Sequence, residues 1–330
     1  MAKDIKICLY TEELKDKWDR FVLTESMNGT FLQSRQFLEY HPQGRFVDHS
    51  LLFMNGGTIV AVLPANLVTD DKKTLYSYQG STFGGLVVGT QFLKISYLDL
   101  IFEKLDAYLI ENGFDEIILK QPGRIYQKHP SELLDYYLFL HGYSDSQEVG
   151  YYVDFSDYAD DIISSFSASR RRDYRYALKN DYTFKRLNCE REIRQFYEIL
   201  SDNYTKFGKL PVHTVEELLD FKFSRLPENT DFYGVYLGGE MIAASMVFQF
   251  DRRVFHTQYL AVRQDKTGLY ANEFLYKNLI ETAKKEGFDC LSFGTSTLEG
   301  GKVLNRPLAQ YKEGFGTTTY VNKTYRKNLK

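Results

Sequence analysis

His256 lies in the middle of the segment VFHTQYLAV (254–262), which has the composition of a β-strand. Strand alternation places it on one face with Val254, Gln258 and Leu260. An imidazole, whose ordinary pKa is near ~6.5, could take a proton from an ammonium group and act as a general base. A strand histidine can also be an interior residue with its hydrogen bonds satisfied, and the sequence leaves both interpretations open.

The segment that follows this strand has a composition suited to binding a phosphate. It leads into a helix predicted over 272–286, and the N–H groups and dipole at a helix N-terminus favour phosphate or pyrophosphate. Gly268 and Ala271 would allow close approach of such a group. The predicted ligand-binding residues of the strand and loop are Leu260, Val262, Lys266, Gly268, Leu269, Tyr270, Ala271 and Asn272.

A run of arginines precedes these elements, in a helix predicted between Ser156 or Asp157, as the N-cap, and Asn180, as the terminating residue. Guanidinium groups can bind phosphate or carboxylate in a bidentate way. Consecutive helical residues cannot all face one ligand, and the same charges would complement the dipole at the helix C-terminus. The candidate substrate-binding residues are Arg171, Arg172 and Arg175, together with Tyr259 at the end of the strand.

The elements that must position these residues occur twice in the chain. Both 50–68 and 231–250 have the form strand, Gly-Gly turn, strand. Both 92–120 and 271–293 are predicted to form an amphipathic helix that ends at a glycine and leads into a strand. A third pair, 131–146 and 305–321, closes each half. The repeats predict a mixed-sheet α/β fold in two tandem domains, 1–148 and 149–330.

Three stretches of the sequence resemble the FemAB-like acyltransferases, which contain two copies of the GNAT (N-acetyltransferase) fold. They are the basic helix that ends Arg175-Tyr176-Ala177-Leu178-Lys179, the segment from Tyr259 to Gly294, and the closing Tyr311-Lys312-Glu313-Gly314-Phe315-Gly316. The resemblance implies two tandem GNAT-like domains, with the acyl-donor site in the second and a degenerate first domain that helps to bind the acceptor.

The resemblance also implies a role for Lys312 near the scissile acyl group, where a cation could stabilise developing negative charge. Tyr311 beside it could donate a hydrogen bond or pack in the core. The donor would be acyl-CoA or aminoacyl-tRNA, and the acceptor an amine of a nucleotide-linked sugar, polysaccharide or cell-wall precursor. The loop at 265–272 has one glycine where GNAT members have Arg/Gln-x-x-Gly-x-Gly/Ala, and the long helical hairpin of many tRNA-dependent relatives has no counterpart over 188–230.

Composition excludes several other classes of protein. The 330 residues are 43% hydrophobic and 26% charged, with a net charge of −3, which is typical of a folded globular protein. Three widely separated cysteines favour a reducing, cytoplasmic setting without a metal site. No run is apolar enough to span a membrane, and no G-x-G-x-x-G or G-x-S-x-G motif indicates dinucleotide or serine-triad chemistry.

The balance of charge bears on partners. The basic residues exceed the acidic ones only in the second half of the chain, which favours that half for an anionic ligand. DNA is not expected as a partner, and tRNA is compatible with the sequence but not favoured. The sequence leaves two functions open, an N-acyltransferase and a non-catalytic double-GNAT protein that binds a ligand through decayed donor sites.

Overall fold

A computed structural model describes residues 4–70, 72–206 and 208–330. The chain forms two compact units, of which the first contains Met1–Glu148, Gly300–Lys302 and Val321–Lys330, and the second contains Val149–Glu299 and Val303–Tyr320. The elements up to Glu148 are β1 (Ile5–Leu9), α1 (Lys15–Arg20), α2 (Arg35–Leu38), β2 (Val47–Asp48), β3 (Leu51–Asn55), β4 (Thr58–Leu63), β5 (Asn66–Val68), β6 (Thr74–Tyr76), β7 (Val87–Val88), α3 (Ile95–Glu111), β8 (Glu116–Gln121), α4 (Leu133–Leu140) and the start of β9 (Ser144–Asp154).

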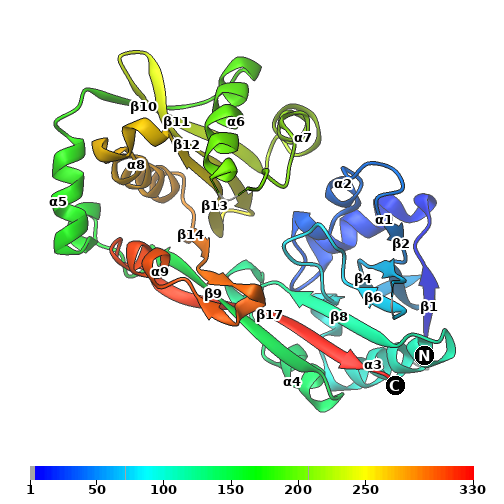
Figure 1. Ribbon diagram of the computed structural model, residues 1–330. Helices are drawn as coiled ribbons and strands as arrows, with labels where there is room; N and C mark the ends of the chain where they lie inside the picture. Colours follow the sequence, from blue (N-terminus) through cyan, green and yellow to red (C-terminus); the bar gives the residue numbers. More distant parts are fainter. Residues whose placement is uncertain (1–3, 71, 207) are drawn as a thin grey trace. The chain divides into compact units, whose positions relative to one another are not determined.

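The elements of the rest of the chain build most of the second unit (Figure 1). They are α5 (Ala168–Ala177), β10 (Tyr182–Arg186), α6 (Glu190–Thr205), α7 (Val215–Asp220), β11 (Thr230–Leu237), β12 (Glu240–Phe250), β13 (Val254–Val262), α8 (Ala271–Lys285), β14 (Cys290–Thr295), β15 (Thr297–Leu298), β16 (Val303–Leu304), α9 (Arg306–Glu313) and β17 (Thr318–Asn328).

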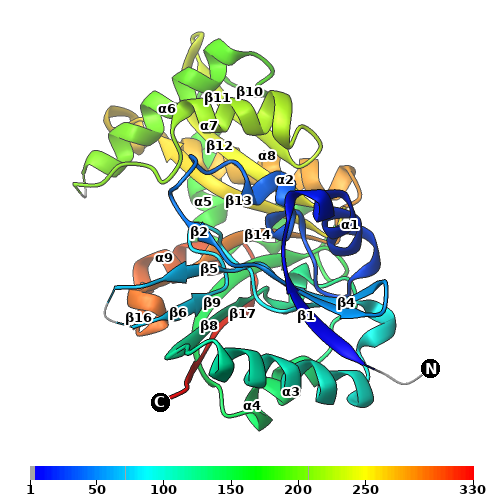
Figure 2. The same cartoon turned by 90° about the vertical axis from the view of Figure 1, so that its right-hand side faces the viewer.

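The sheet of the second unit follows the order β10-β11-β12-β13-β14-β9. Its first four strands are antiparallel, whereas β13 and β14 are parallel and β14 is antiparallel to β9. Figure 2 shows α6 on one face of β11–β13 and α8 on the other. The apolar face of α8, with Leu275, Leu279 and Ile280, packs into a core with Val235 and Leu291 of the strands. Burial of these side chains holds α8, and therefore the loop before it, against the sheet.

The first unit contains the same kinds of element, but its strands form two sheets. One is antiparallel with the order β1-β3-β4-β7. In the other, β8 is parallel to β6, which is followed by β5 and β2. Leu98, Phe102 and Leu105 of α3 pack into the main core of this unit. The predicted mixed α/β architecture is therefore present in both units.

The last strand of each repeat completes the sheet of the other unit. Residues 150–154 of β9, which follows α4 in the chain, pair with β14 in the second unit. Residues 323–328 of β17, which follows α9, pair with β8 in the first unit. The compact units therefore differ from a division into 1–148 and 149–330, because the end of the chain and Gly300–Lys302 group with the first unit. Ladder pairing of a terminal strand is a long-range feature that sequence periodicity does not report.

The local landmarks of the repeat appear as predicted. The hairpins β3–β4 and β11–β12 turn at glycines with positive φ, namely Gly56, Gly238 and Gly239. The helices α3 and α8 are followed by Gly113 and Gly287. These positions required only local turn chemistry, which short sequence patterns report well.

The start of the arginine-bearing helix was predicted wrongly. The chain after Asp161 makes only a short 3-10 turn over Ile162–Ser165, and α5 begins at Ala168, with the Ser167 side chain accepting from the N–H of Arg170. Phe166, between the two elements, is buried with its ring 5.1 Å from that of Phe315. The anchoring of Phe166 and the serine cap start the helix later than the acidic residues suggested.

Within the described residues, no helix has the length and apolar character required to cross a bilayer.

Candidate acyl-transfer site of the second unit

The strands β13 and β14 pair only at their beginnings. Residues 254–256 of β13 are in parallel register with 290–292 of β14. Past this point a β-bulge shifts the register of β13 on β12, while β14 continues along β9. The part of β13 over 257–262 therefore has a backbone edge that is not part of the ladder with β14. An edge of this kind can hydrogen-bond an extended ligand.

Lys312 of α9 lies at the end of β14. Its side chain is buried, with 4% of the residue exposed, and Nζ donates to the carbonyl oxygens of Gly294 at 3.0 Å and Thr295 at 2.7 Å. Burial lowers the pKa of Lys312 to about 7, because the charged form loses its hydration. An ammonium group has three N–H donors, so these two bonds leave one for a further acceptor.

His256 hydrogen-bonds a polar group at the opening between the two strands. Its Nδ1 lies 3.0 Å from Oγ of Ser292, which is 3.2 Å from the hydroxyl of Tyr320. Burial first, and the charge of Lys312 second, lower the pKa of His256 to about 4. The imidazole is therefore neutral at pH 7 and is a weaker base than an ordinary histidine. Gly294 lies beside both Lys312 and His256, because its carbonyl oxygen accepts from Lys312 Nζ and a Cβ added to it would lie 3.5 Å from Cε1 of His256.

Tyr311 has the contacts of a core residue. Its ring packs against those of Phe315 and Tyr276, and the guanidinium of Arg170 lies 4.6 Å from its centroid. Burial raises the pKa of Tyr311 well above its ordinary value. The catalytic role predicted for this tyrosine stays a prediction, and the structure adds a packing role.

The arginines of α5 are used mainly in internal interactions. Arg171 donates to the backbone oxygens of Ser164 and Phe166, and Arg172 pairs with Asp173 at 3.0 Å. Arg175 is exposed. Their predicted substrate contacts remain untested, but Arg171 and Arg172 have structural partners that the sequence did not reveal.

Arg170 belongs to the arginine run but was not among the predicted substrate-binding residues, and it makes the buried ion pairs of this helix. It contacts Glu273 in the first turn of α8 and pairs with Asp173 at 3.0 Å, and all three side chains are mostly buried. Burial raises the pKa of Glu273. The three charges fix the N-terminus of α8 against α5, which places the loop before α8. The spacing Arg170 to Asp173, one helical turn, was the available signal.

The loop between β13 and α8, which is predicted to bind the phosphate of the donor and is called the donor loop below, forms a 3-10 helix over Gln264–Leu269. Tyr270 then adopts a left-handed conformation before α8 begins at Ala271. The carbonyl oxygen of Leu269 accepts from the hydroxyl of Tyr182 at 2.8 Å. A Cβ added at Gly268 would meet no heavy atom within 4 Å. The space beside Gly268 is therefore open, and the contacts of the protein itself do not require glycine at this position.

Tyr259 lies on β13 and is buried. Its hydroxyl is 2.7 Å from Nδ1 of His213, a residue of the segment between α6 and α7. His213 is also buried. Local sequence patterns did not indicate this partner, because 46 residues separate Tyr259 from His213.

The first unit has a parallel strand pair, β6 and β8, like that of β13 and β14. The chain after β6 continues to bond to β8, so these two strands do not separate as β13 and β14 do. After β6, the N–H of Ser77 donates to Ile118 O and the N–H of Lys120 donates to Ser77 Oγ, at 2.8 and 2.7 Å. The N–H of Gly84 then donates to Lys120 O at 2.9 Å. The chain after β6 therefore stays bonded to β8, whereas β13 separates from β14.

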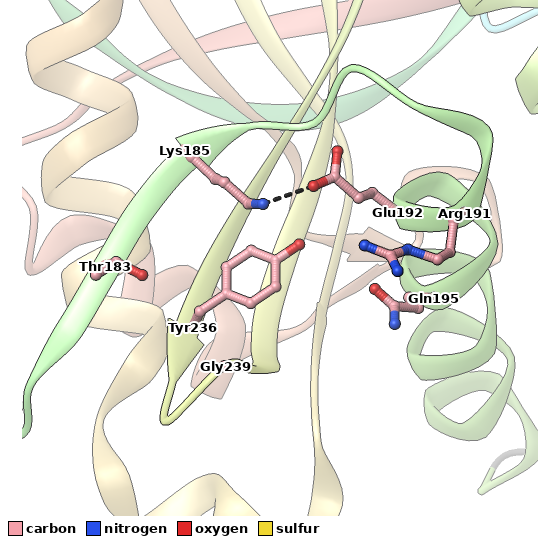
Figure 3. Close-up of a pocket in the computed structure, with 7 residues that line it drawn as sticks. All are labelled: Thr183, Lys185, Arg191, Glu192, Gln195, Tyr236 and Gly239. Atoms are coloured by element: carbon pink, nitrogen blue, oxygen red, sulfur yellow. Dashed lines mark hydrogen bonds and ion pairs between the residues drawn. The ribbon is translucent and has the colours of Figure 1, made fainter.

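A surface groove lies beside the first turns of α6 (Figure 3). It is lined by Thr183, Lys185, Arg191, Glu192, Gln195, Tyr236 and Gly239. Lys185 pairs with Glu192 at 2.6 Å and covers the ring of Tyr236, with Nζ 4.6 Å from its centroid. None of the predicted site residues lines this groove.

The described residues contain no cluster of His, Cys, Asp and Glu that could hold a metal ion.

A segment in the second half of the chain matches a known protein family. Residues 164–313 match the family model for the acetyltransferase (GNAT) domain. This segment is similar to a GNAT domain. The matched region contains the bulged β13, the loop before α8 and Lys312. The predicted resemblance to the GNAT fold is therefore confirmed for the matched region.

Solved structures extend the likeness over the whole chain. FemX has a TM-score of 0.68 at 11% identity, with 97% of this chain and 96% of that chain covered. A tandem GNAT protein from the clavulanic acid biosynthesis pathway has a TM-score of 0.57 at 9% identity, with 99% of each chain covered. L-PGS from Bacillus licheniformis has a TM-score of 0.54 at 15% identity, with 81% and 80% covered. A search of curated protein sequences found no match. The two-GNAT fold predicted from the sequence is thus confirmed.

Proposed function

We propose that this protein is an N-acyltransferase whose second unit transfers an acetyl or aminoacyl group to an amine. The observation that carries the proposal is the buried ammonium of Lys312 at the end of β14, beside the opening between β13 and β14. The donor would be acyl-CoA or aminoacyl-tRNA. The acceptor would be an amine of a nucleotide-linked sugar, polysaccharide or cell-wall precursor, reached in the cytoplasm.

In this reaction the neutral amine attacks the acyl carbonyl carbon, and a C–N bond forms while negative charge develops on the carbonyl oxygen. The remaining N–H of Lys312 would donate to that oxygen or to the departing sulfur or oxygen. The C–S or C–O bond then breaks, the amine nitrogen loses one proton, and the thiolate or alkoxide takes one. The low local polarity that lowers the pKa of Lys312 also strengthens such an interaction.

We further propose that the first unit has no donor site and contributes to acceptor binding. The support is the edge of β8, whose backbone groups are bonded to Ser77 and Gly84 of the same unit. In the second unit, Gly268 leaves open space beside the loop and Lys266 supplies a positive charge. These differences favour a single donor site.

A non-catalytic ligand-binding protein is the second candidate function. Two features of the donor loop favour this function. The carbonyl oxygen of Leu269 accepts a hydrogen bond from Tyr182, and the loop has one glycine where GNAT members usually have the fuller glycine pattern. The two candidates differ in turnover. Incubation with acetyl-CoA or with aminoacyl-tRNA and an amino-sugar nucleotide such as UDP-glucosamine, followed by mass spectrometry, should show an acylated amine for the enzyme. Ligand binding without product from any donor and acceptor pair would favour the binding protein.

A further inference from the structure

The outward edge of β13 at Val262 is already bonded by a side chain. The N–H of Arg263 donates to Ile242 O on β12 at 2.8 Å. Because inward and outward groups alternate along an antiparallel strand, the N–H and C=O of Val262 point away from β12, as do those of Leu260. They therefore lie on the edge that separates from β14.

Asn203 in the last turn of α6 contacts both of these groups. Its Nδ2 donates to Val262 O at 2.8 Å, and Val262 N–H lies 3.5 Å from Oδ1. A side-chain amide thus takes the place that the amide of an extended ligand would take on the edge of the strand. The neighbouring residue Asp202 contributes its carbonyl oxygen, which accepts from Nε2 of Gln264 at 2.5 Å.

The contacts continue on both sides of Asn203. Nδ2 also donates to Ile199 O one turn earlier, at 2.8 Å, which fixes the amide on its helix. His213 then reaches Tyr259 on the same strand. The end of α6 and the segment after it therefore hold β13 at two residues, Tyr259 and Val262, and hold the start of the loop before α8 at Gln264.

We propose that Asn203 is a donor-specificity residue, which competes with the pantetheine arm of an acyl-CoA for Val262. This inference rests on the proposed function, and it narrows the donor. A pantetheine arm carries two amides and can lie extended along a strand edge, whereas an acyl ester lacks such amides next to the acyl group. Asn203 therefore disfavours a coenzyme A thioester and favours an ester donor.

Calorimetric titration with desulfo-coenzyme A tests the inference. N203A should bind the probe about tenfold more tightly than wild type, the change expected from one hydrogen bond that no longer has to be broken. The matched control is Asn112→Ala in the first unit, since Asn112 also donates to the carbonyl oxygen four residues earlier, at 2.8 Å, on an exposed helix end. That variant should bind as wild type does.

Hydrogen exchange supplies a second reading that needs no ligand. The amide of Val262 should exchange several-fold faster in N203A than in wild type, and the amide of Ala261, which faces β12, should not change. Asn203→Asp keeps an acceptor for Val262 N–H and loses the donor, so it should give an intermediate effect if N203A proves unstable.

Equal affinity for the probe in wild type and N203A would overturn the inference while leaving an acyl-CoA donor in place. Weaker binding by N203A would also overturn it, because the amide would then assist the ligand. Absence of binding by both proteins would show that another feature excludes coenzyme A and would contradict a role for Asn203. The proposed acyl transfer is decided separately, by turnover with an aminoacyl ester donor.

Discussion

The ammonium of Lys312 lies 2.7 Å from the carbonyl oxygen of Thr295. Thr295 pairs with Gly150 of β9, so the acceptor of this hydrogen bond is fixed in the sheet. A second bond to Gly294 O fixes the ammonium further. A buried cation held in this way has little freedom to reorganise, which is the condition under which a charge stabilises a transition state effectively.

The rate of acyl transfer should depend on the protonation of Lys312. Because its pKa lies near 7, the ammonium is lost as the pH rises through that value, and single-turnover rates should fall above it. Lys312→Arg keeps the charge at all these pH values, so it should move the fall to higher pH. His256→Gln should not change the pH at which the rate falls, since His256 has a pKa of about 4. A pH–rate profile unchanged in Lys312→Arg would show that another group titrates.

The stability of the protein should also depend on pH through Lys312. The pKa of Lys312 is about 7 in the folded protein and has the ordinary lysine value in the unfolded chain. At pH values between these two, Lys312 is protonated in the unfolded chain and largely deprotonated in the folded protein. The free energy of unfolding should therefore rise with pH above about 7, as far as this lysine is concerned. Lys312→Met should reduce that slope in urea unfolding at pH 6.5, 8 and 9.5. An identical slope in the variant would contradict a lowered pKa.

Loss of Arg170 should destabilise the second unit. Arg170→Ala leaves Asp173 and Glu273 buried without their guanidinium partner, and breaking a buried pair in this way costs about 3–5 kcal/mol. Arg175→Ala, at an exposed position of the same helix, should change the free energy of unfolding by less than about 0.5 kcal/mol. Denaturant unfolding of both variants measures the difference. Equal effects would mean that the buried network does not hold α5 on α8.

A bulky side chain at Gly268 should weaken donor binding without harming the fold. Gly268→Val would fill the open space beside the loop, so the affinity for a phosphate-bearing donor should fall while the melting temperature changes little. Gly57→Val is the matched control in the first unit, because a Cβ there also meets nothing within 4 Å. Gly89, the corresponding loop position, is unsuitable, since a Cβ would lie 2.7 Å from Phe92. Equal losses of affinity in Gly268→Val and Gly57→Val would remove the assignment of the donor loop.

The features predicted correctly from the sequence are those encoded by local patterns. The glycine hairpins at Gly56 and Gly238, the helices ending before Gly113 and Gly287, and the order of elements in each repeat depend on neighbouring residues. The late start of α5 was missed because it depends on the packing of Phe166 against Phe315, which lie 149 positions apart.

The candidate site was predicted less completely than the fold. The resemblance supplied Lys312, but burial, which lowers the pKa of this lysine, is a property of the assembled sheet. Asn203 carried no signal at all, since a polar residue in the last turn of a helix is ordinarily solvated. Its contact with Val262 arises only when α6 is laid on the sheet. Long-range contacts of this kind cannot be obtained from periodicity.

Single-turnover acyl transfer by Lys312→Met tests most directly whether Lys312 stabilises the transition state. Methionine fills similar volume without charge, so folding should be preserved, and Lys285→Met, at an exposed lysine of α8, is the matched control. If Lys312 stabilises the transition state, the rate should fall by about 10²–10³ in Lys312→Met, with donor affinity and melting temperature close to wild type. The control should keep the wild-type rate. A rate within about threefold of wild type in a folded Lys312→Met protein would contradict a role for Lys312 in stabilising the transition state.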